Sequence, residues 1–300
     1  MRGFLAVTDP GWYRYLALGP GPRDANFWRP STRRFRSVET GSPFLFKLKA
    51  PHHAVAGFGY FAGFTVLPDW LAWETFGQAN GVDGLESLRQ RLGRIRSGAG
   101  IEARPGGLIG CCLVAEARFF QPDDWVRPPA SWRPRAQTGI TYDLTEGEGR
   151  RVWEECLARV PARMPEAPRY GSLSTYRPRL GQGIFRVHVL DAYGRGCAMT
   201  GEHSLPVLEA AHIRPYSEGG LHEVSNGLAL RTDLHRLFDH GYVTLDEDLR
   251  VVVGARLREE FDNGRSYYRL QGRRLLAPRE RILGPDEQQL AWHREHVFLG

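Results

Sequence analysis

The chain has 300 residues, of which 42% are hydrophobic and 25% are charged. This length predicts about two domains, each large enough to bury its own core, and the composition excludes a disordered or fibrous protein. The formal net charge of +6 is compatible with a polyanionic partner such as nucleic acid, but it does not require one.

Cysteine usage and hydropathy indicate the compartment. The four cysteines form no CxxC pair and no disulfide framework, which is typical of a reducing cytosol. No apolar run approaches the roughly 18 residues of a membrane span, and no signal-peptide core follows the N-terminus. We therefore expect a cytoplasmic protein with no membrane partner.

Residues 1–125 contain several short strand patterns and two helical patterns. Short apolar runs predict strands over 3–8, 54–62 and 108–120, and alternation of apolar and polar residues predicts a half-buried strand over 41–49, with an aromatic loop over 26–30. Asp9-Pro10 predicts the start of a short helix, and leucine spacing predicts another over 85–96. Many short strands with two helices favour a small, strongly curved β-barrel.

Basic and aromatic residues concentrate near the N-terminus. The segment from Arg23 to Lys49 contains seven basic and two acidic residues. Of the 40 basic residues in the chain, only two are lysine. Cationic groups beside aromatic faces neutralise phosphates and stack on bases. The alternative is that the aromatic residues belong to the core and the arginines are solvated. The candidate nucleic-acid-binding residues are Trp12, Tyr15, Phe27, Trp28, Arg29, Arg33, Arg34, Arg36, Lys47 and Lys49.

Two short phrases carry a family resemblance for this region, Gly-x-x-Phe-Leu-Phe-Lys-Leu over residues 41–48 and Val-x-Gly-Phe-Gly over residues 55–59. With the order of elements, they resemble the PUA-like superfamily that includes the EVE and ASCH domains. Such domains commonly hold a nucleobase, often a modified one flipped from DNA. The resemblance implies that residues 1–125 read a modified base.

Residues 126–180 are rich in proline and arginine. Proline is excluded from central strands and helix interiors, so we predict a linker. Helical spacing over 148–160 predicts one connecting helix within it. The third segment, residues 181–300, is expected to begin with a helix over 182–193, and later segments predict helices over 256–261 and 286–298 and strands over 242–245, 249–253 and 267–270.

Three polar residues lie in order in the third segment. His212 lies on a predicted strand over 207–213, Asn226 follows a paired glycine, and His235 lies on a predicted helix over 233–240 that Thr232 caps and Gly241 ends. This order resembles the HNH endonuclease motif, and the resemblance covers about residues 180–250 closely. It implies an α+β chain whose C-terminal domain has the ββα-metal fold, as in predicted HNH restriction endonucleases.

The resemblance assigns roles to these side chains. His212 is the expected base that activates water, since imidazole titrates near neutral pH. Asn226 would fix the loop and the ring of His212, and His235 would bind one divalent ion, Mg²⁺ or Mn²⁺, with Asp239 on the same helix face. Taken singly, each of the three is more often structural, and we expect the other histidines to be structural or exposed, namely His203, His222, His240, His293 and His296.

Two departures from the motif affect the metal. Such nucleases usually place an acidic or histidine ligand directly before the base, where this chain has Ala211. Glu209, two residues earlier, or Asp239 would have to compensate as a metal ligand. Zinc-stapled relatives carry CxxC pairs where this chain has Thr200 and later Asp233, so we expect no structural zinc.

The sequence thus predicts a metal-dependent DNA endonuclease that acts on double-stranded DNA, with a modified-base reader in front. The two resemblances together imply a modification-dependent, type IV-like restriction enzyme, and cutting both strands favours a homodimer. One alternative is a non-cleaving DNA- or RNA-binding protein with a degenerate HNH fold. Another is an HNH nuclease without modification preference.

Overall fold

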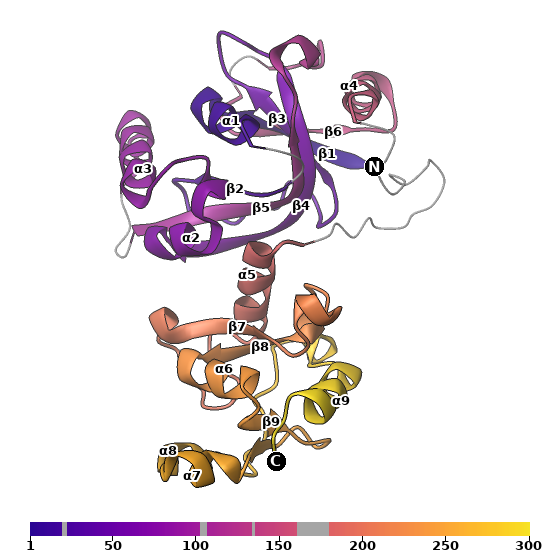
Figure 1. Ribbon diagram of the computed structural model, residues 1–300. Coiled ribbons are helices and arrows are strands. Elements are labelled where there is room, and N and C mark those ends of the chain that lie inside the picture. The colour runs from indigo at the N-terminus through magenta and orange to yellow at the C-terminus, as the bar shows by residue number, and fades with distance from the viewer. Residues whose placement is uncertain (20–22, 103–106, 134–135, 161–179) are drawn as a thin grey trace. The chain divides into compact units, whose positions relative to one another are not determined.

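The structure is a computed structural model that describes residues 1–19, 23–102, 107–133, 136–160 and 180–300 (Figure 1). The chain divides into two compact units, Met1–Gly181 and Gln182–Gly300. Each unit has its own hydrophobic core. No helix within the described ranges is long and apolar enough to cross a membrane.

Unit 1 is built on a six-stranded sheet with the order β2-β5-β4-β3-β1-β6. Only the β1–β3 pair is parallel, and the other neighbours are antiparallel. Among the described residues no pairing joins the edge strands β2 and β6, so the closed barrel that the sequence predicts is not confirmed. The strands are β1 (Arg2–Thr8), β2 (Arg23–Arg29), β3 (Pro43–Leu48), β4 (Val55–Pro68), β5 (Leu108–Phe119) and β6 (Gly139–Asp143).

Strand β3 is buried on both faces, not on one as the sequence predicts. Phe44 and Phe46 pack into a cluster of aromatic side chains with Trp12, whereas Leu45 packs with Phe58 and others on the opposite face. Successive side chains of β3 do point to opposite faces, but helix α4 (Gly147–Ala158) covers the face that we expected to be solvated. The predicted loop at 26–30 is likewise part of strand β2, because it pairs with β5.

Helices α1, α3 and α4 of unit 1 agree with the sequence pattern. Helix α1 (Pro10–Ala17) begins at Asp9, whose carboxylate accepts hydrogen bonds from the backbone N–H groups of Gly11 and Trp12. The other helices are α2 (Asp69–Phe76), α3 (Leu85–Ala99) and α4 (Gly147–Ala158), of which α2 was not predicted.

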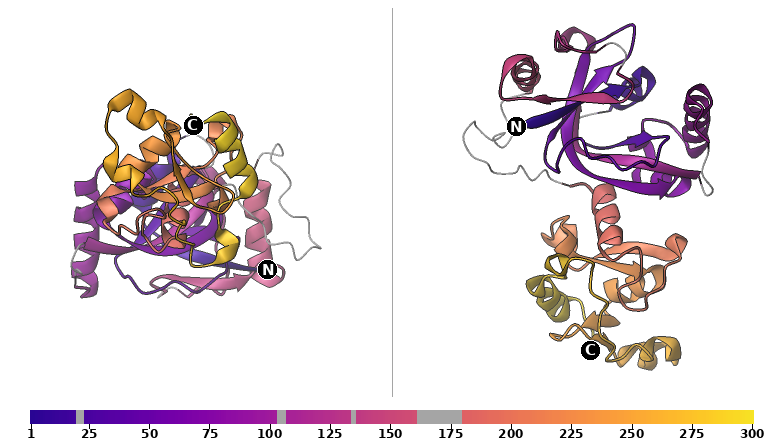
Figure 2. Two further views of the ribbon diagram at one scale, coloured as in Figure 1. Left: turned by 90° about the horizontal axis from the view of Figure 1, so that it is seen from below. Right: turned by 180° about the vertical axis from the view of Figure 1, so that it is seen from behind.

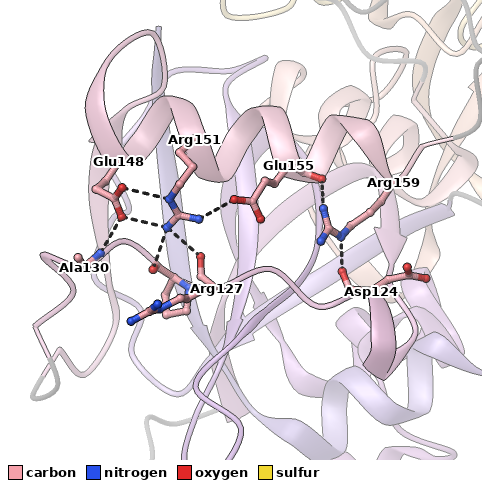
Figure 3. A network of polar contacts seen from close by, with 8 residues as sticks. Asp124, Arg127, Ala130, Glu148, Arg151, Glu155 and Arg159 are labelled. Atoms are coloured by element: carbon pink, nitrogen blue, oxygen red, sulfur yellow. Dashed lines mark hydrogen bonds and ion pairs between the residues drawn. The ribbon is translucent and has the colours of Figure 1, made fainter.

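The region predicted as a linker belongs largely to unit 1. Val126 bridges to Val55, β6 pairs with β1, and α4 buries Trp153 against the sheet. Arg151 of α4 donates hydrogen bonds to the carbonyls of Arg127 and Pro128 and to two glutamates (Figure 3). Pro128 and Pro129 are tolerated because the described residues between Val126 and β6 are irregular; residues 134–135 and 161–179 lie outside the described ranges.

Unit 2 contains a ββα arrangement preceded by a helix (Figures 1 and 2). Strands β7 (Leu208–His212) and β8 (Gly227–Arg231) form an antiparallel pair, and α5 (Gln182–Ala192) and α6 (Thr232–Asp239) pack against it. The remaining elements are β9 (Val243–Leu245), β10 (Val251–Val253), α7 (Arg256–Phe261), α8 (Arg265–Tyr268) and α9 (Glu287–His296).

Two local predictions for unit 2 are wrong. Thr232 is the first residue of α6, and its hydroxyl donates to the carbonyl of Val207 instead of capping the helix. The strand expected over 267–270 is helical in α8, where Tyr267 and Tyr268 use their hydroxyls in tertiary hydrogen bonds. Tertiary contacts therefore override the strand preference of tyrosine. Gly241 ends α6 as predicted, with φ of 77°.

Candidate functional site

His212 is the last residue of β7, and its ring stacks on Phe185 of α5. The ring centroids are 4.0 Å apart with planes at 14°. Across the strand pair His212 faces Gly227, where a Cβ atom would come within 2.5 Å of Val189 and 2.9 Å of Phe185. Gly227 is therefore needed for the close approach of α5 and not for a turn. This packing fixes the orientation of the His212 ring.

The environment of His212 favours the neutral imidazole. Burial lowers the pKa of His212 to about 4, and the charges of His222 and His235 act in the same direction, while Asp239 opposes them. The Nε2 atom is buried and has no hydrogen-bond partner among the described residues. At neutral pH the ring is thus unprotonated, the form that a general base requires.

Asn226 is buried and closes the loop between β7 and β8. Its Oδ1 accepts from the backbone N–H of Arg214 at 2.9 Å, and its Nδ2 donates to the carbonyls of Arg214 at 2.9 Å and Leu221 at 3.0 Å. A Cβ atom at Gly220 would lie 2.7 Å from that Nδ2 atom. Asn226 fixes the loop as expected, but within the described chain it makes no hydrogen bond to His212.

His235 is held between two carboxylates. Its Nδ1 lies 2.7 Å from Glu209 of β7, and its Nε2 lies 3.2 Å from Asp239, one turn further along α6. Burial alone would lower the pKa of His235, but its hydrogen bonds to the carboxylates of Asp239 and Glu209 outweigh burial and raise the pKa. Helix α6 and strand β7 thus contribute to one polar cluster, and the charges of His235 and Asp239 in it shift the pKa of His212.

The donor set of this cluster limits how a metal ion can bind. Among the described residues no group of three or more His, Cys, Asp or Glu side chains is placed to hold a metal. Ala211 is fully buried in the core, so an acidic residue at that position would point away from the site. The residues fit a cation shared by His235 Nε2 and Asp239, since Mg²⁺ commonly uses one or two protein ligands with waters and phosphate oxygens.

Sequence analysis missed several neighbours of His212. The ring of His222, expected to be structural or exposed, lies 5.1 Å from that of His212 and 4.8 Å from that of Tyr216. Arg214 lies over the ring of Trp292 at 5.1 Å. These residues come from the loop between β7 and β8 and from α9, so the spacing of the motif along β7 and α6 did not predict that they lie near His212. The expectation for His293 holds, because it is buried and hydrogen-bonded to Thr244.

A second candidate site is a cavity of about 1330 Å³ within unit 1. Arg33, Arg34, Arg36 and Lys49 are exposed at its lining, whereas Lys47 is only 3% exposed. The lining includes every predicted nucleic-acid-binding residue except Tyr15. These are Trp12, Phe27, Trp28, Arg29, Arg33, Arg34, Arg36, Lys47 and Lys49.

The aromatic residues of the cavity are shared with the core. Trp12 is buried, and its indole N–H donates to the carbonyl of Asn26, while that of Trp28 donates to the carbonyl of Asn80. The core interpretation of Trp12 is therefore correct, although the residue still lines the cavity. Trp132, from the predicted linker, also lines the cavity. A tryptophan in a proline-rich stretch was the only feature of the sequence that could have indicated this.

Comparison with known proteins identifies part of unit 2. Residues 197–246 match the HNH endonuclease family, which confirms the resemblance seen in the sequence for this part of unit 2. No curated protein matches the chain.

Similar solved structures cover parts of the chain. One is a modification-dependent TagI restriction endonuclease, with 24% identity, a TM-score of 0.28, and coverage of 38% of this chain and 37% of that one. Two are crystal structures of an ASCH protein from Zymomonas mobilis, one of them a mutant. They have 13% and 12% identity and a TM-score of 0.34, and the matches cover 50% and 51% of this chain and 96% and 94% of theirs.

Proposed function

We propose that the protein is a metal-dependent endonuclease for double-stranded DNA. The observation that carries the proposal is the pairing of a neutral His212 at the end of β7 with the Glu209–His235–Asp239 cluster. A base and a cation-binding group beside one another are what phosphodiester hydrolysis needs. The match of residues 197–246 to the HNH endonuclease family supports the same chemistry.

In this mechanism each side chain has one role. His212 accepts a proton from the attacking water, while its stacking on Phe185 keeps the imidazole neutral and oriented. Asn226 holds the loop that carries Arg214. A divalent cation, Mg²⁺ or Mn²⁺, when bound by His235 Nε2 and Asp239, supplies charge that stabilises the leaving oxygen.

Glu209 receives a role different from the predicted one. Its carboxylate accepts the Nδ1–H of His235, on the side of the ring opposite to the Nε2 atom that faces Asp239. Carboxylates in this position fix the tautomer and direction of a ligating histidine. Glu209 therefore acts as a positioning residue for His235, and the protein ligands of the cation are His235 and Asp239.

The cavity of unit 1 is proposed to read a modified base. It combines exposed cations for backbone phosphates with aromatic walls at which a flipped base can stack. A reader joined to a nuclease is the arrangement of a modification-dependent restriction enzyme. Cutting both strands needs two active sites, which a homodimer would provide.

Cleavage of supercoiled plasmid with Mg²⁺ or Mn²⁺ tests the active site. His212→Ala is expected to lose at least about a hundredfold in rate, because a positioned base contributes about 10²–10⁴. The matched control is His240→Ala, since His240 is exposed just beyond α6. Equal cutting by His212→Ala and the parent would refute the assignment.

Two further measurements separate the alternatives. Absence of divalent-ion binding to the parent in calorimetry would favour a non-cleaving nucleic-acid-binding protein. Equal cleavage of unmodified, methylated, hydroxymethylated and phosphorothioated DNA would favour a nuclease without modification preference. Sedimentation with and without DNA reports whether the protein is a dimer.

A further inference from the structure

Lys47 is the one charged residue in the lining of the unit 1 cavity that is almost completely buried. It lies on β3, between β1 and β4, opposite Val7 and Val55, and is 3% exposed. Lysine is almost never buried to this degree without an anionic partner, because its ammonium group is strongly hydrated. Burial accordingly lowers the pKa of Lys47.

The groups around the ammonium do not balance its charge. Nζ lies 3.3 Å from Nδ1 of His53 and 4.7 Å from the centroid of the Trp132 ring. Within the described ranges no carboxylate lies within ion-pair distance of Lys47, and Asp9 is the only acidic residue in the lining. An ammonium group has three N–H donors, so Lys47 retains donors for an oxygen in the cavity.

The other cations of the cavity are placed differently. Arg33, Arg34, Arg36 and Lys49 are exposed and can follow a phosphate backbone from outside. Lys47, in contrast, is buried against His53 and Trp132, where a backbone that remains in solvent does not reach. The group that meets Lys47 must therefore enter the cavity, as a flipped base does.

We propose that Lys47 donates a hydrogen bond to an acceptor oxygen on the base held in this cavity, and thereby selects bases with an oxygen-bearing substituent. The inference rests on the proposed reading of modified bases by unit 1. A carboxyl group would be the strongest partner, because it offers charge and two acceptor atoms. A hydroxymethyl group would follow, and a methyl group would leave the buried ammonium without a partner.

Binding in the presence of EDTA tests the proposal without cleavage. The probes are short duplexes with one central cytosine that is unmodified, 5-methyl, 5-hydroxymethyl or 5-carboxyl. The parent is expected to bind the carboxyl duplex about tenfold or more tightly than the methyl duplex. Lys47→Met keeps the length of the side chain and should reduce that ratio to less than about twofold.

Lys49→Met is the matched control, since Lys49 lines the same cavity but is exposed. If Lys49 contacts a backbone phosphate, Lys49→Met should weaken binding of all four duplexes alike. The slope of log affinity against log salt concentration should then fall by about one. If Lys47→Met also weakens all four alike, its partner is a backbone phosphate or its role is structural, and the proposal is wrong. An unchanged ratio in Lys47→Met likewise overturns it.

The two lysines also permit a direct observation. Protein labelled with ¹³C at lysine Cε should give two side-chain signals, which Lys49→Arg assigns. The Lys47 signal should move with the carboxyl duplex and much less with the methyl duplex. If the parent prefers none of the modified duplexes, base reading by unit 1 fails together with this inference. If the parent has a preference that Lys47→Met retains, only this inference fails.

Discussion

The carboxylates on both sides of His235 determine which of its nitrogens can bind a cation. Glu209 accepts from Nδ1 at 2.7 Å, which leaves Nε2 on the side of Asp239 at 3.2 Å. The raised pKa of His235 follows from these two partners, which outweigh its burial. A cation bound at Nε2 would place positive charge beside the same carboxylates that raise this pKa.

Substitutions of Glu209 distinguish positioning from direct ligation. Glu209→Ala removes the partner of Nδ1 and should weaken Mn²⁺ binding by about 10–100-fold, the usual cost of losing a group that orients a ligating histidine. Glu209→Gln keeps an acceptor and should stay within about threefold of the parent. Calorimetric titration measures both affinities. Equal losses in the two variants would indicate that Glu209 is itself a ligand.

Asn226 should matter for folding as well as for activity. Asn226→Ala removes three hydrogen bonds that hold the loop together, two of them to Arg214 at its start, and it leaves partly buried backbone groups unpaired. We expect unit 2 to lose about 2–4 kcal/mol of unfolding free energy in urea. Glu223→Gln, exposed in the same loop, should change it by less than about 0.5 kcal/mol. A cost below 1 kcal/mol for Asn226→Ala would contradict this account.

The residues of the motif were predictable, but their surroundings were not. The order of His212, Asn226 and His235 follows from local spacing along a strand, a loop and a helix. The stacking of His212 on Phe185 and the approach of His222 depend on how α5 and the loop pack, which no spacing in the chain encodes. Nor does local spacing predict that Ala211 is buried, and its burial explains why no metal ligand stands at the position before His212.

At the scale of elements, the part of unit 1 hardest to predict was its end. Strand β6 is only half-buried at the edge of the sheet, so its sequence lacks a clear alternation. Helix α4 had a clear apolar spacing, but that spacing does not say which sheet it covers. The pairing of β6 with β1 and the packing of Trp153 on Phe58 are contacts between residues far apart in sequence. Local patterns carry no information on such pairs.

Arg151 is expected to stabilise this end of unit 1 more than an ordinary surface arginine. Its guanidinium ties α4 to the carbonyls of Arg127 and Pro128 as well as to Glu148 and Glu155 (Figure 3). Arg151→Met should therefore lower the unfolding free energy of unit 1 by about 1–2 kcal/mol.

The control for this prediction lies next to it on the same helix. Arg150 forms an exposed ion pair with Glu154 at i and i+4, and such pairs contribute about 0.5 kcal/mol or less. Denaturation with urea, followed by fluorescence, measures both variants. If Arg150→Met lowers the unfolding free energy as much as Arg151→Met does, the hydrogen bonds of Arg151 to the backbone add no stability.

At the scale of the whole molecule, the two units bury separate sets of apolar side chains. The aromatic clusters of unit 1 and the core around α5, β7 and β8 in unit 2 have no residue in common. Separate cores of this kind favour separate unfolding transitions. The contacts divide the chain after Gly181, whereas the proline-rich stretch led us to expect a linker over residues 126–180.

Acid should destabilise unit 2 through His293. This histidine is 1% exposed, stacks on Phe238, and is hydrogen-bonded through Nε2 to the carbonyl of Phe238 and through Nδ1 to Thr244. A carbonyl only accepts, so Nε2 carries the proton and Thr244 donates to Nδ1. Burial lowers the pKa of His293 to about 4; the Phe238 carbonyl and Asp239 oppose that shift, and Arg294 adds to it.

The sign of the pH dependence follows from this lowered pKa. The unfolded chain binds a proton at His293 near pH 6.5, whereas the folded chain does so only near pH 4, so unit 2 loses stability as the pH falls between these values. The full effect amounts to about 3 kcal/mol. His293→Gln should show a correspondingly shallower loss between pH 6.5 and 4, measured as the difference from the parent in urea unfolding. Should the variant not fold, ¹H–¹³C spectra of the parent give the pKa directly, and titration of His293 above pH 6 would contradict the prediction.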